Sequence, residues 1–271
     1  MNPNWYWPTP NGKPPITVVL SIVLPIVVLV LTASTVDISY NKIFHALPRM
    51  LDFTKNLVVM PDWKYLPQLG KKMLETVEMT LLATMLAVVI SMPLGILAAK
   101  NASPHPFVFR MTRDLLSLIR SLPELVWALV FVSAVGLGPL PGIMALALVT
   151  VGFMGKFIAE SIEVVSTKAI EGLESTGCNK FKSILYAMLP QAVPDFIGSL
   201  LYILDHNLRA ASILGLVGAG GIGYDMVMSM CLFNYERIGM IALSIYALVT
   251  LLDRLSDVFR QKAIGGILNV H

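Results

Sequence analysis

Long apolar stretches of similar length recur along this chain, and they constrain its fold more than any other feature. A helix needs about 20 predominantly apolar residues to cross the hydrocarbon of a bilayer. The chain is 56% hydrophobic and 14% charged, whereas a soluble domain carries about 25% charged residues. Because such a chain cannot cover its surface with polar groups, we predict an all-α, polytopic membrane protein. Six spans are expected, at residues 16–36, 77–99, 107–135, 143–162, 196–217 and 238–252.

The first span has two interpretations. It follows Trp5, Tyr6 and Trp7, whose amphipathic rings suit the headgroup region of a membrane. A cleaved signal peptide is the alternative. An uncleaved helix is favoured, because the apolar run is longer than the core of a signal peptide and residues 33–35 form a poor cleavage site.

The composition predicts three regions. Residues 1–75 hold the first span and a polar extracytoplasmic connection, which ends in an amphipathic stretch at 66–75 that leads into the membrane. Residues 76–257 form the core of the fold, and residues 258–271 form a cytoplasmic tail.

Two of the predicted spans depart from a uniform apolar helix. Pro93 and Gly95 interrupt the second span. The third begins amphipathically at Phe107, becomes apolar from 125 to 135, and carries three arginines, Arg110, Arg113 and Arg120. Small residues such as the pair at 152 and 155 let helices approach closely in lipid, and ordinary bundle packing is the simplest interpretation of them.

The distribution of basic residues predicts an orientation. Placing both termini in the cytoplasm puts more lysine and arginine on the cytoplasmic side than on the other side, as the positive-inside tendency requires. Cys178 and Cys231 then lie on opposite sides, so they form no disulfide framework. The excess of basic over acidic residues, 20 against 17, does not indicate a nucleic-acid partner, since no basic run is interleaved with aromatic residues.

The polar interruption between the fourth and fifth spans carries most information about function. Gly177 lies where a turn needs a residue that tolerates a positive φ, and Pro190 is expected to stop the helical stretch before it. On both sides of Gly177, apolar residues recur at helical spacing, namely Leu173, Phe181, Ile184, Leu185 and Met188. The pattern predicts a short helix, a turn and a second short helix at the cytoplasmic surface.

This segment resembles the EAA loop of ABC importer permeases, since Gly177 follows Glu171 by six residues and Leu189 and Pro190 come after it. The resemblance implies that the loop docks into a cytoplasmic ATPase and transmits its closure to the transmembrane helices. An interfacial loop without a partner is the alternative. Gly172 and Leu173 stand where the family has two alanines, and an isoleucine of its pattern is replaced at Ala187. The expected coupling residues are Glu171, Gly172, Glu174, Gly177, Asn179, Lys180, Leu189 and Pro190.

Residues 175–191 and 207–223 are similar to the corresponding segments of phosphonate-type permeases, and the resemblance extends from 74 to 257. It implies the type I importer architecture in a bacterial inner membrane. The implied partners are a second, identical permease chain, ATPase subunits that hold ATP and Mg²⁺, and an extracytoplasmic binding protein. The implied substrate is phosphonate, phosphite or hypophosphite. Methionine-type permeases share the fold and part of the glycine pattern, so an amino-acid importer is the alternative.

The glycines at the end of the fifth span satisfy a dinucleotide-binding fingerprint literally. That fingerprint requires a preceding strand and an acidic residue about 20 residues further on. Here an apolar span precedes the glycines, and the next acidic residues come too early. We therefore expect a tight, close-packed re-entrant turn at Gly218, Gly220, Gly221 and Gly223.

Charged residues inside the fifth span mark a candidate translocation pathway, because charge within a membrane is costly and indicates function by default. Asp205 and Arg209 are four residues apart, so one helical face can hold them as a pair. Two interpretations remain open. The pair can fix packing, or Arg209 can line a path for an anionic substrate. The candidate pathway residues are Asp205, Asn207, Arg209 and Ser212.

The sequence predicts neither a catalytic site nor a metal site. The remaining histidines are isolated, so no zinc cluster is expected. The phosphate-binding GxxxxGK[ST] motif is absent, so ATP hydrolysis requires another subunit. A membrane enzyme using Asp205 and His206 is disfavoured, because neighbours on a helix point about 100° apart. A channel or ion-coupled carrier would leave the segment at 171–190 without a purpose. We expect a transport subunit that binds no cofactor itself.

Overall fold

The computed structural model describes residues 16–35, 40–57 and 62–268. The aromatic residues expected at headgroup level near the N-terminus lie outside the described residues. Contacts divide the chain into two compact units, Met1–Asn56 and Leu57–His271. In the described ranges the secondary structure is helical throughout, which confirms the predicted all-α class.

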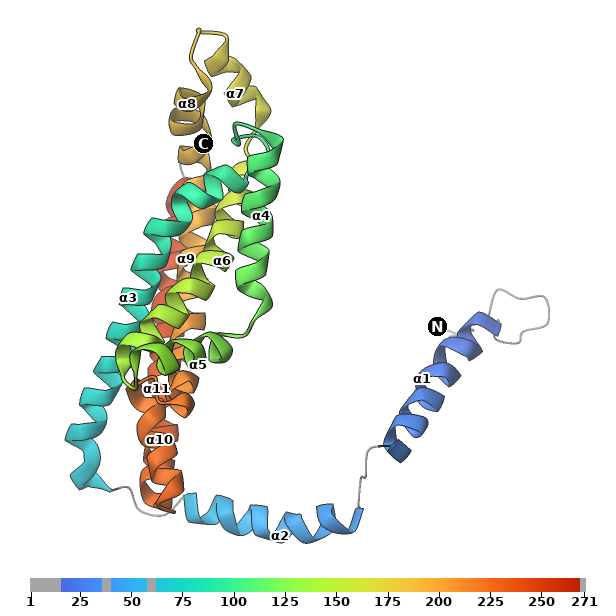
Figure 1. The fold of residues 1–271 in the computed structure, drawn as a ribbon, viewed down its shortest axis with the longest axis vertical. Helices are drawn as coiled ribbons and strands as arrows, with labels where there is room; N and C mark the ends of the chain where they lie inside the picture. Colours follow the sequence, from blue (N-terminus) through green and yellow to red (C-terminus); the bar gives the residue numbers. More distant parts are fainter. Residues whose placement is uncertain (1–15, 36–39, 58–61, 269–271) are drawn as a thin grey trace, which may run out of the picture. The chain divides into compact units, whose positions relative to one another are not determined.

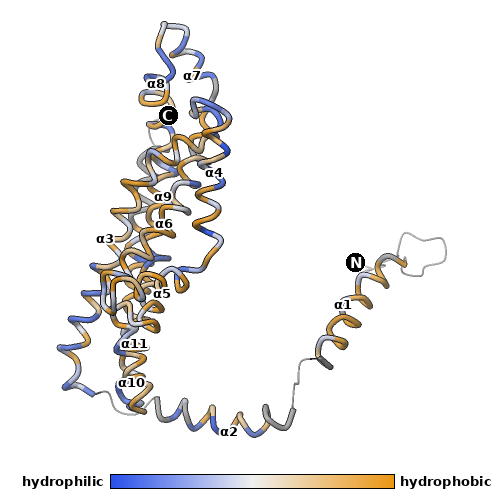
Figure 2. Tube along the Cα trace, in the orientation of Figure 1, coloured by the Kyte–Doolittle hydropathy of each residue, from blue (hydrophilic) through white to orange (hydrophobic). Residues whose placement is uncertain are grey.

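The first unit begins with α1 (Ile16–Thr35), which corresponds to the first predicted span. This helix is mostly hydrophobic (Figure 2), and large apolar side chains such as Leu20 and Leu24 are exposed along it. A helix surrounded by lipid has this character. Its apolar part, Val18–Ala33, is shorter than the long candidate spans of the second unit.

The helix α2 (Tyr40–Leu57) corrects the sequence analysis, which treated this region as a polar connection. Phe44, Leu47 and Leu51 follow one another at helical spacing and are exposed, and Arg49 falls on the opposite face. Pro48 lies inside the helix. Because proline usually ends a helix, the sequence analysis did not predict a helix across this position. The two-faced character is that of a helix lying on a membrane surface.

The second unit is a helical bundle (Figure 1). It contains η1 (Trp63–Tyr65), α3 (Leu66–Ala98), α4 (Pro106–Ser121), α5 (Glu124–Val135), α6 (Pro139–Glu163), α7 (Thr167–Glu174), α8 (Lys180–Ser183), η2 (Ile184–Met188), α9 (Leu189–Leu214), η3 (Gly215–Val217), α10 (Gly221–Cys231) and α11 (Tyr235–Leu268). Among the described residues, the segments long and apolar enough to cross a membrane are Trp63–Ala98, Pro139–Glu163, Lys180–Val217 and Tyr235–Val258, and the bent pair α4 and α5 makes a fifth. The predicted fourth, fifth and sixth spans lie within these segments, and the second does so except for its last residue, Ala99.

The helix α3 is longer than the predicted second span. The amphipathic stretch expected at 66–75 continues into it without a break, so the predicted division between residues 75 and 76 falls inside one helix. Pro93 is also accommodated inside α3. A row of small buried residues faces α6, where a Cβ on Gly95 would approach Ile158 to 2.6 Å. The row consists of Ala83, Ala87, Ser91 and Gly95. This close packing against α6 stabilises the helix more than Pro93 disrupts it.

The third predicted span is wrong as a single helix, because α4 and α5 meet at an angle of 84°. Pro123 explains the break, since a residue that precedes proline is pushed away from helical geometry. Leu122 is accordingly extended, with φ −103° and ψ 136°. The side chain of His105 caps the start of α4 by accepting a hydrogen bond from the backbone N–H of Phe107.

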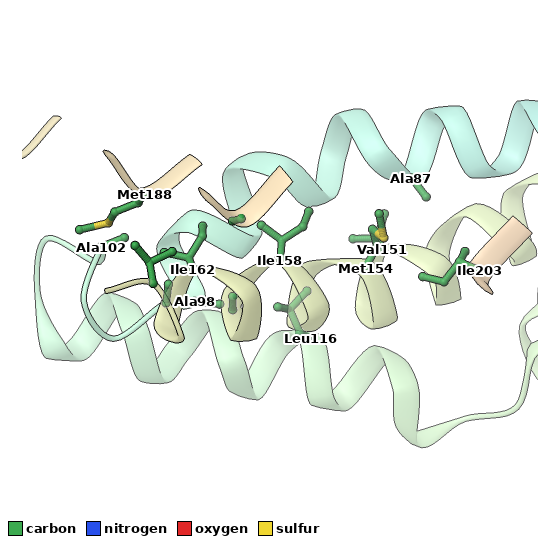
Figure 3. Close-up of a cluster of buried hydrophobic side chains, with 14 residues drawn as sticks. Ala87, Ala98, Ala102, Leu116, Val151, Met154, Ile158, Ile162, Met188 and Ile203 are labelled. Carbon is green, nitrogen blue, oxygen red and sulfur yellow. The ribbon is translucent and has the colours of Figure 1, made fainter. Parts of the chain in front are cut away.

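The helix α6 lies at the centre of the bundle and is buried along most of its length. Figure 3 shows Val151, Met154 and Ile158 of α6 between side chains of α3 and α4. A Cβ on Gly155 would lie 2.9 Å from Leu116 of α4. Small residues at this contact let the two helices approach closely, as the sequence suggested.

Candidate functional site

The predicted sequence of short helix, turn and short helix is present at one end of the bundle, where α7 and α8 extend beyond the longer helices (Figure 1). Gly177 adopts φ +85° in the turn between them, a conformation that favours glycine. Asn179 caps α8, because its side-chain oxygen accepts a hydrogen bond from the N–H of Lys182 at 3.0 Å.

Exposed apolar side chains distinguish this coupling segment (residues 167–190) from an ordinary connection. Phe181 is 72% exposed and Tyr186 is 67% exposed. Ile184 and Met188 instead pack on the buried cluster of the bundle. Lys180 anchors the segment, since its Nζ donates a hydrogen bond to the carbonyl of Ser103 between α3 and α4 at 2.8 Å. The remaining predicted coupling residues on α7, Glu171, Gly172 and Glu174, are exposed.

Pro190 does not end the second short helix, and this corrects the sequence analysis. The chain runs from α8 through the π-helical turn η2 into α9 without a break, and Lys180–Val217 forms one candidate span. Pro190 lies in the first turn of α9, where a missing N–H costs little. The coupling segment is therefore joined directly to a transmembrane helix.

The glycines after α9 form the tight turn that the sequence predicted. Gly218, Gly220 and Gly221 all have positive φ. Gly223 packs against α9, where an added Cβ would lie 2.0 Å from the carbonyl oxygen of Ser212. The turn brings the short helix α10 back against the bundle.

Two residues of α3 that the sequence analysis missed hold the start of α10. The N–H of Gly221 donates to the carboxylate of Glu75 at 3.0 Å, and the N–H of Ile222 donates to the hydroxyl of Thr76 at 2.8 Å. Helix starts leave such N–H groups without intrahelical partners. No local sequence pattern predicts a contact between residues 146 positions apart, so these hydrogen bonds become evident only from the structure.

The predicted pair on α9 is present. Arg209 lies 2.6 Å from the carboxylate of Asp205, and it also lies 3.2 Å from Asp253 of α11. The side chain of Arg209 is 54% exposed, whereas that of Asp205 is 15% exposed. These two ion pairs link α9 to α11 through Arg209.

Asn207 and His206 connect α9 to other helices. Asn207 is buried, donates to Thr84 of α3 at 2.9 Å and accepts from Thr150 of α6 at 3.0 Å. His206 lies 3.0 Å from Glu124 in the first turn of α5. Ser212, also a predicted pathway residue, donates only to the carbonyl of Leu208 in its own helix.

Replacing Asn207 by alanine is expected to destabilise the folded bundle by about 1–2 kcal/mol, because hydrogen bonds to two other helices are lost. The melting temperature of the purified protein in detergent measures this effect. Thr250→Val is a matched control, since Thr250 is bonded only to the carbonyl of Tyr246 in its own helix. Equal melting temperatures for the two variants would contradict the bridging role of Asn207.

A second polar cluster joins the other end of the bundle. The hydroxyl of Tyr65 donates to the carboxylate of Asp225 on α10. Arg237 of α11 lies 3.1 Å from Asp62 and stacks over the ring of Tyr65 at 4.9 Å. The sequence analysis missed this cluster, which ties α10 and α11 to the beginning of α3.

The polar face of α9 borders a small cavity of about 30 Å³, which has room for one or two water molecules. It is lined by Thr150, Phe153, Tyr202, Ile203, His206 and Asn207. The described residues contain no group of three or more histidine, cysteine or acidic side chains placed to hold a metal ion.

Comparisons with known proteins agree with this architecture. The model of a family described as "Binding-protein-dependent transport system inner membrane component" matches residues 91–265. A phosphite transport system permease protein of Stutzerimonas stutzeri is 40% identical over 201 residues, which cover 74% of this chain and 73% of that protein. A phosphate-import permease protein of Mycolicibacterium smegmatis is 40% identical over 190 residues, which cover 70% of this chain and 36% of that protein.

Solved structures give the same fold. An inward-facing MetNI methionine ABC transporter contains a chain that matches with a TM-score of 0.65 at 20% identity, over 74% of this chain and 99% of that chain. At this identity the likeness concerns the fold alone. The predicted architecture of a type I importer permease is confirmed at that level.

Proposed function

Because the chain belongs to the family of inner membrane components of binding-protein-dependent transport systems, we propose that it is the permease of an ATP-driven importer of phosphite, phosphonate or a related phosphorus oxyanion. The oxyanion class rests on the name and the 40% identity of the phosphite transport relative. The proposal includes a bacterial inner membrane, with both termini in the cytoplasm.

The coupling segment is the observation that carries the ATP-driven part of the proposal. Its exposed Phe181 and Tyr186 are suited to an interface, since aromatic side chains are enriched at the centres of protein contacts. We assign this surface to a cytoplasmic ATPase subunit, which binds and hydrolyses ATP with Mg²⁺. The direct connection from α8 to α9 gives a physical route by which movement of the ATPase reaches the membrane.

A second copy of the permease completes the proposed pathway. The cavity beside α9, at about 30 Å³, has room for one or two waters and is too small to be a passage by itself. Arg209 and Asp253 remain about half exposed, although charge facing hydrocarbon is costly. A passage between two identical chains accounts for both observations, and an extracytoplasmic binding protein would deliver the substrate to it.

We place Asp205, Arg209 and Ser212 along this passage, with Asn207 buried behind them inside the bundle. Replacing Arg209 by alanine is expected to lower uptake several-fold while the complex still assembles, because two carboxylates lose their partner but the bundle core is untouched. Uptake of labelled phosphite and recovery of the ATPase with the tagged permease measure the two effects. Full assembly with unchanged uptake would refute a role of Arg209 in transport.

Uptake in cells that lack this chain tests the function itself, with phosphite, phosphonate and methionine offered as separate labelled substrates. We expect phosphite or phosphonate uptake to disappear and to return with the intact gene. Loss of methionine uptake alone would support the amino-acid alternative. Unchanged uptake of all three would refute the proposed substrate class.

A further inference from the structure

The arginines of the bundle differ in whether their charge has a partner. Arg113 pairs with Glu163 at 2.9 Å, Arg209 pairs with Asp205 and Asp253, and Arg237 pairs with Asp62. Arg120 of α4 has no carboxylate or other hydrogen-bond acceptor among the described residues, and its Nε atom is buried. Its one close partner there is the ring of Phe153, 4.6 Å from the guanidinium carbon.

The position of Arg120 makes this unpaired charge costly. It packs on Gly152 and Phe153, near the middle of the 25-residue helix α6, and a Cβ on Gly152 would lie 2.7 Å from Arg120 Cγ. Figure 3 shows Leu116, one turn earlier on α4, directed at the same helix. A cation at this depth in a membrane protein is costly, so its presence indicates a functional site by default.

Arg120 lies beside a helix break, and its ring partner borders a small cavity. It lies at the end of α4, next to the break before α5, and broken helices at mid-depth provide substrate contacts in transporters. Its ring partner Phe153 lines the small cavity beside α9 and contacts the ring of His206 at 6.0 Å. Arg120 therefore belongs to the same polar region as His206 and Glu124.

We infer that Arg120 is the side chain with which this permease contacts the phosphorus oxyanion at mid-depth. A guanidinium offers paired donors that match two oxygens of a phosphite or phosphonate group. The ring of Phe153 holds the cation in place without neutralising it. Arg209, which we place along the passage, is already paired with two carboxylates and so offers less free charge to the substrate. This inference rests on the proposed function.

Arg120→Gln tests the inference in the intact transporter. We expect phosphite uptake to fall about tenfold or more, because charge-assisted hydrogen bonds to the substrate are lost. Arg120→Lys, which retains the charge, should keep an intermediate rate. Arg110→Gln is the matched control, since Arg110 lies on the same helix and is exposed, and its uptake should equal that of the wild type.

A labelling experiment separates substrate contact from a structural role. Cys178 and Cys231 are replaced by serine, the exposed Ser121 next to Arg120 is replaced by cysteine so that Arg120 stays in place, and a cationic thiol reagent is applied to the assembled transporter. Phosphite should slow modification of this cysteine and leave an Arg110→Cys variant unaffected. Equal rates with and without phosphite, or loss of assembly in Arg120→Gln without protection in the cysteine variant, would overturn the inference and indicate a structural contact.

The proposed function and this inference fail in different ways. If wild-type cells take up neither phosphite nor phosphonate, the substrate class is wrong and the assignment of Arg120 falls with it. If wild-type uptake is normal and Arg120→Gln matches it, only the assignment of Arg120 is wrong.

Discussion

Replacing Gly177 by aspartate is expected to abolish uptake while the permease still folds. Gly177 has φ +85°, and no described atom beyond its chain neighbours lies within 4 Å of a Cβ built there, so a new side chain is free to meet a partner. Aspartate is among the residues that tolerate this backbone conformation. An unpaired charge in a protein contact costs several kcal/mol, and each 1.4 kcal/mol is about tenfold in binding. Uptake and recovery of the ATPase with the tagged permease measure the loss.

Two control variants isolate the cause. Gly177→Asn has a similar shape without the charge and should retain more uptake. Gly70→Asp makes the same change at an exposed glycine of α3, where a Cβ also has no neighbour, and should leave uptake near normal. Normal uptake and normal ATPase recovery in Gly177→Asp would refute the docking role of the coupling segment.

Replacing Gly223 by alanine should destabilise the bundle strongly, although the change adds only one methyl group. The added Cβ would lie 2.0 Å from the backbone oxygen of Ser212 and 3.1 Å from the Cα of Gly215. Overpacking usually costs about 1–3 kcal/mol, and a contact with backbone places this change at or above the upper limit. We expect the melting temperature to fall by roughly 10 °C, measured on the purified permease in detergent.

Gly198→Ala is the matched control for Gly223→Ala. It is the same substitution, it lies in α9, and no described atom outside the adjoining backbone of its own helix lies within 4 Å of the added Cβ. Alanine favours helix over glycine by up to about 1 kcal/mol, so this variant should be neutral or more stable. Two variants with equal melting temperatures would show that the approach of α10 to α9 is looser than the structure describes.

The sequence was most informative where chemistry is local. Gly177, the helical spacing around it and the glycines after α9 predicted turns that the structure contains. The charged pair of Asp205 and Arg209 followed from a separation of four residues. Each of these depends on neighbours in the chain, which a single sequence records directly.

Predictions failed where tertiary contacts decide the outcome. Proline was expected to interrupt helices, yet Pro93 and Pro190 are accommodated while Pro123 marks a real break. Whether a proline is accommodated or breaks the helix depends on packing against α6 and on the position of the proline within its helix. Glu75 was not a candidate because its partner, Gly221, lies far along the chain.

Arg120 shows a further limit of sequence alone. Its place in an amphipathic stretch gave no reason to single it out from Arg110 and Arg113. The difference lies in their partners, since Arg113 reaches Glu163 of α6 whereas Arg120 reaches an aromatic ring. Sequence identifies the charged groups, and only the fold reveals that Arg110 is exposed, that Arg113 has a counter-charge and that Arg120 lies against α6 without one among the described residues.

The π-helical turn η2 joins α8 to α9 and holds one more residue than an α-helical turn would. Successive residues of a helix turn by about 100° around its axis. Removing a single residue within Ile184–Met188 would leave an α-helical turn that completes about the same revolution, so Phe181 would keep nearly the same direction relative to the faces of α9. A deletion within α9 would instead rotate Phe181 and the rest of the coupling segment by roughly a quarter-turn, so this junction tolerates a change in length that the transmembrane helix does not.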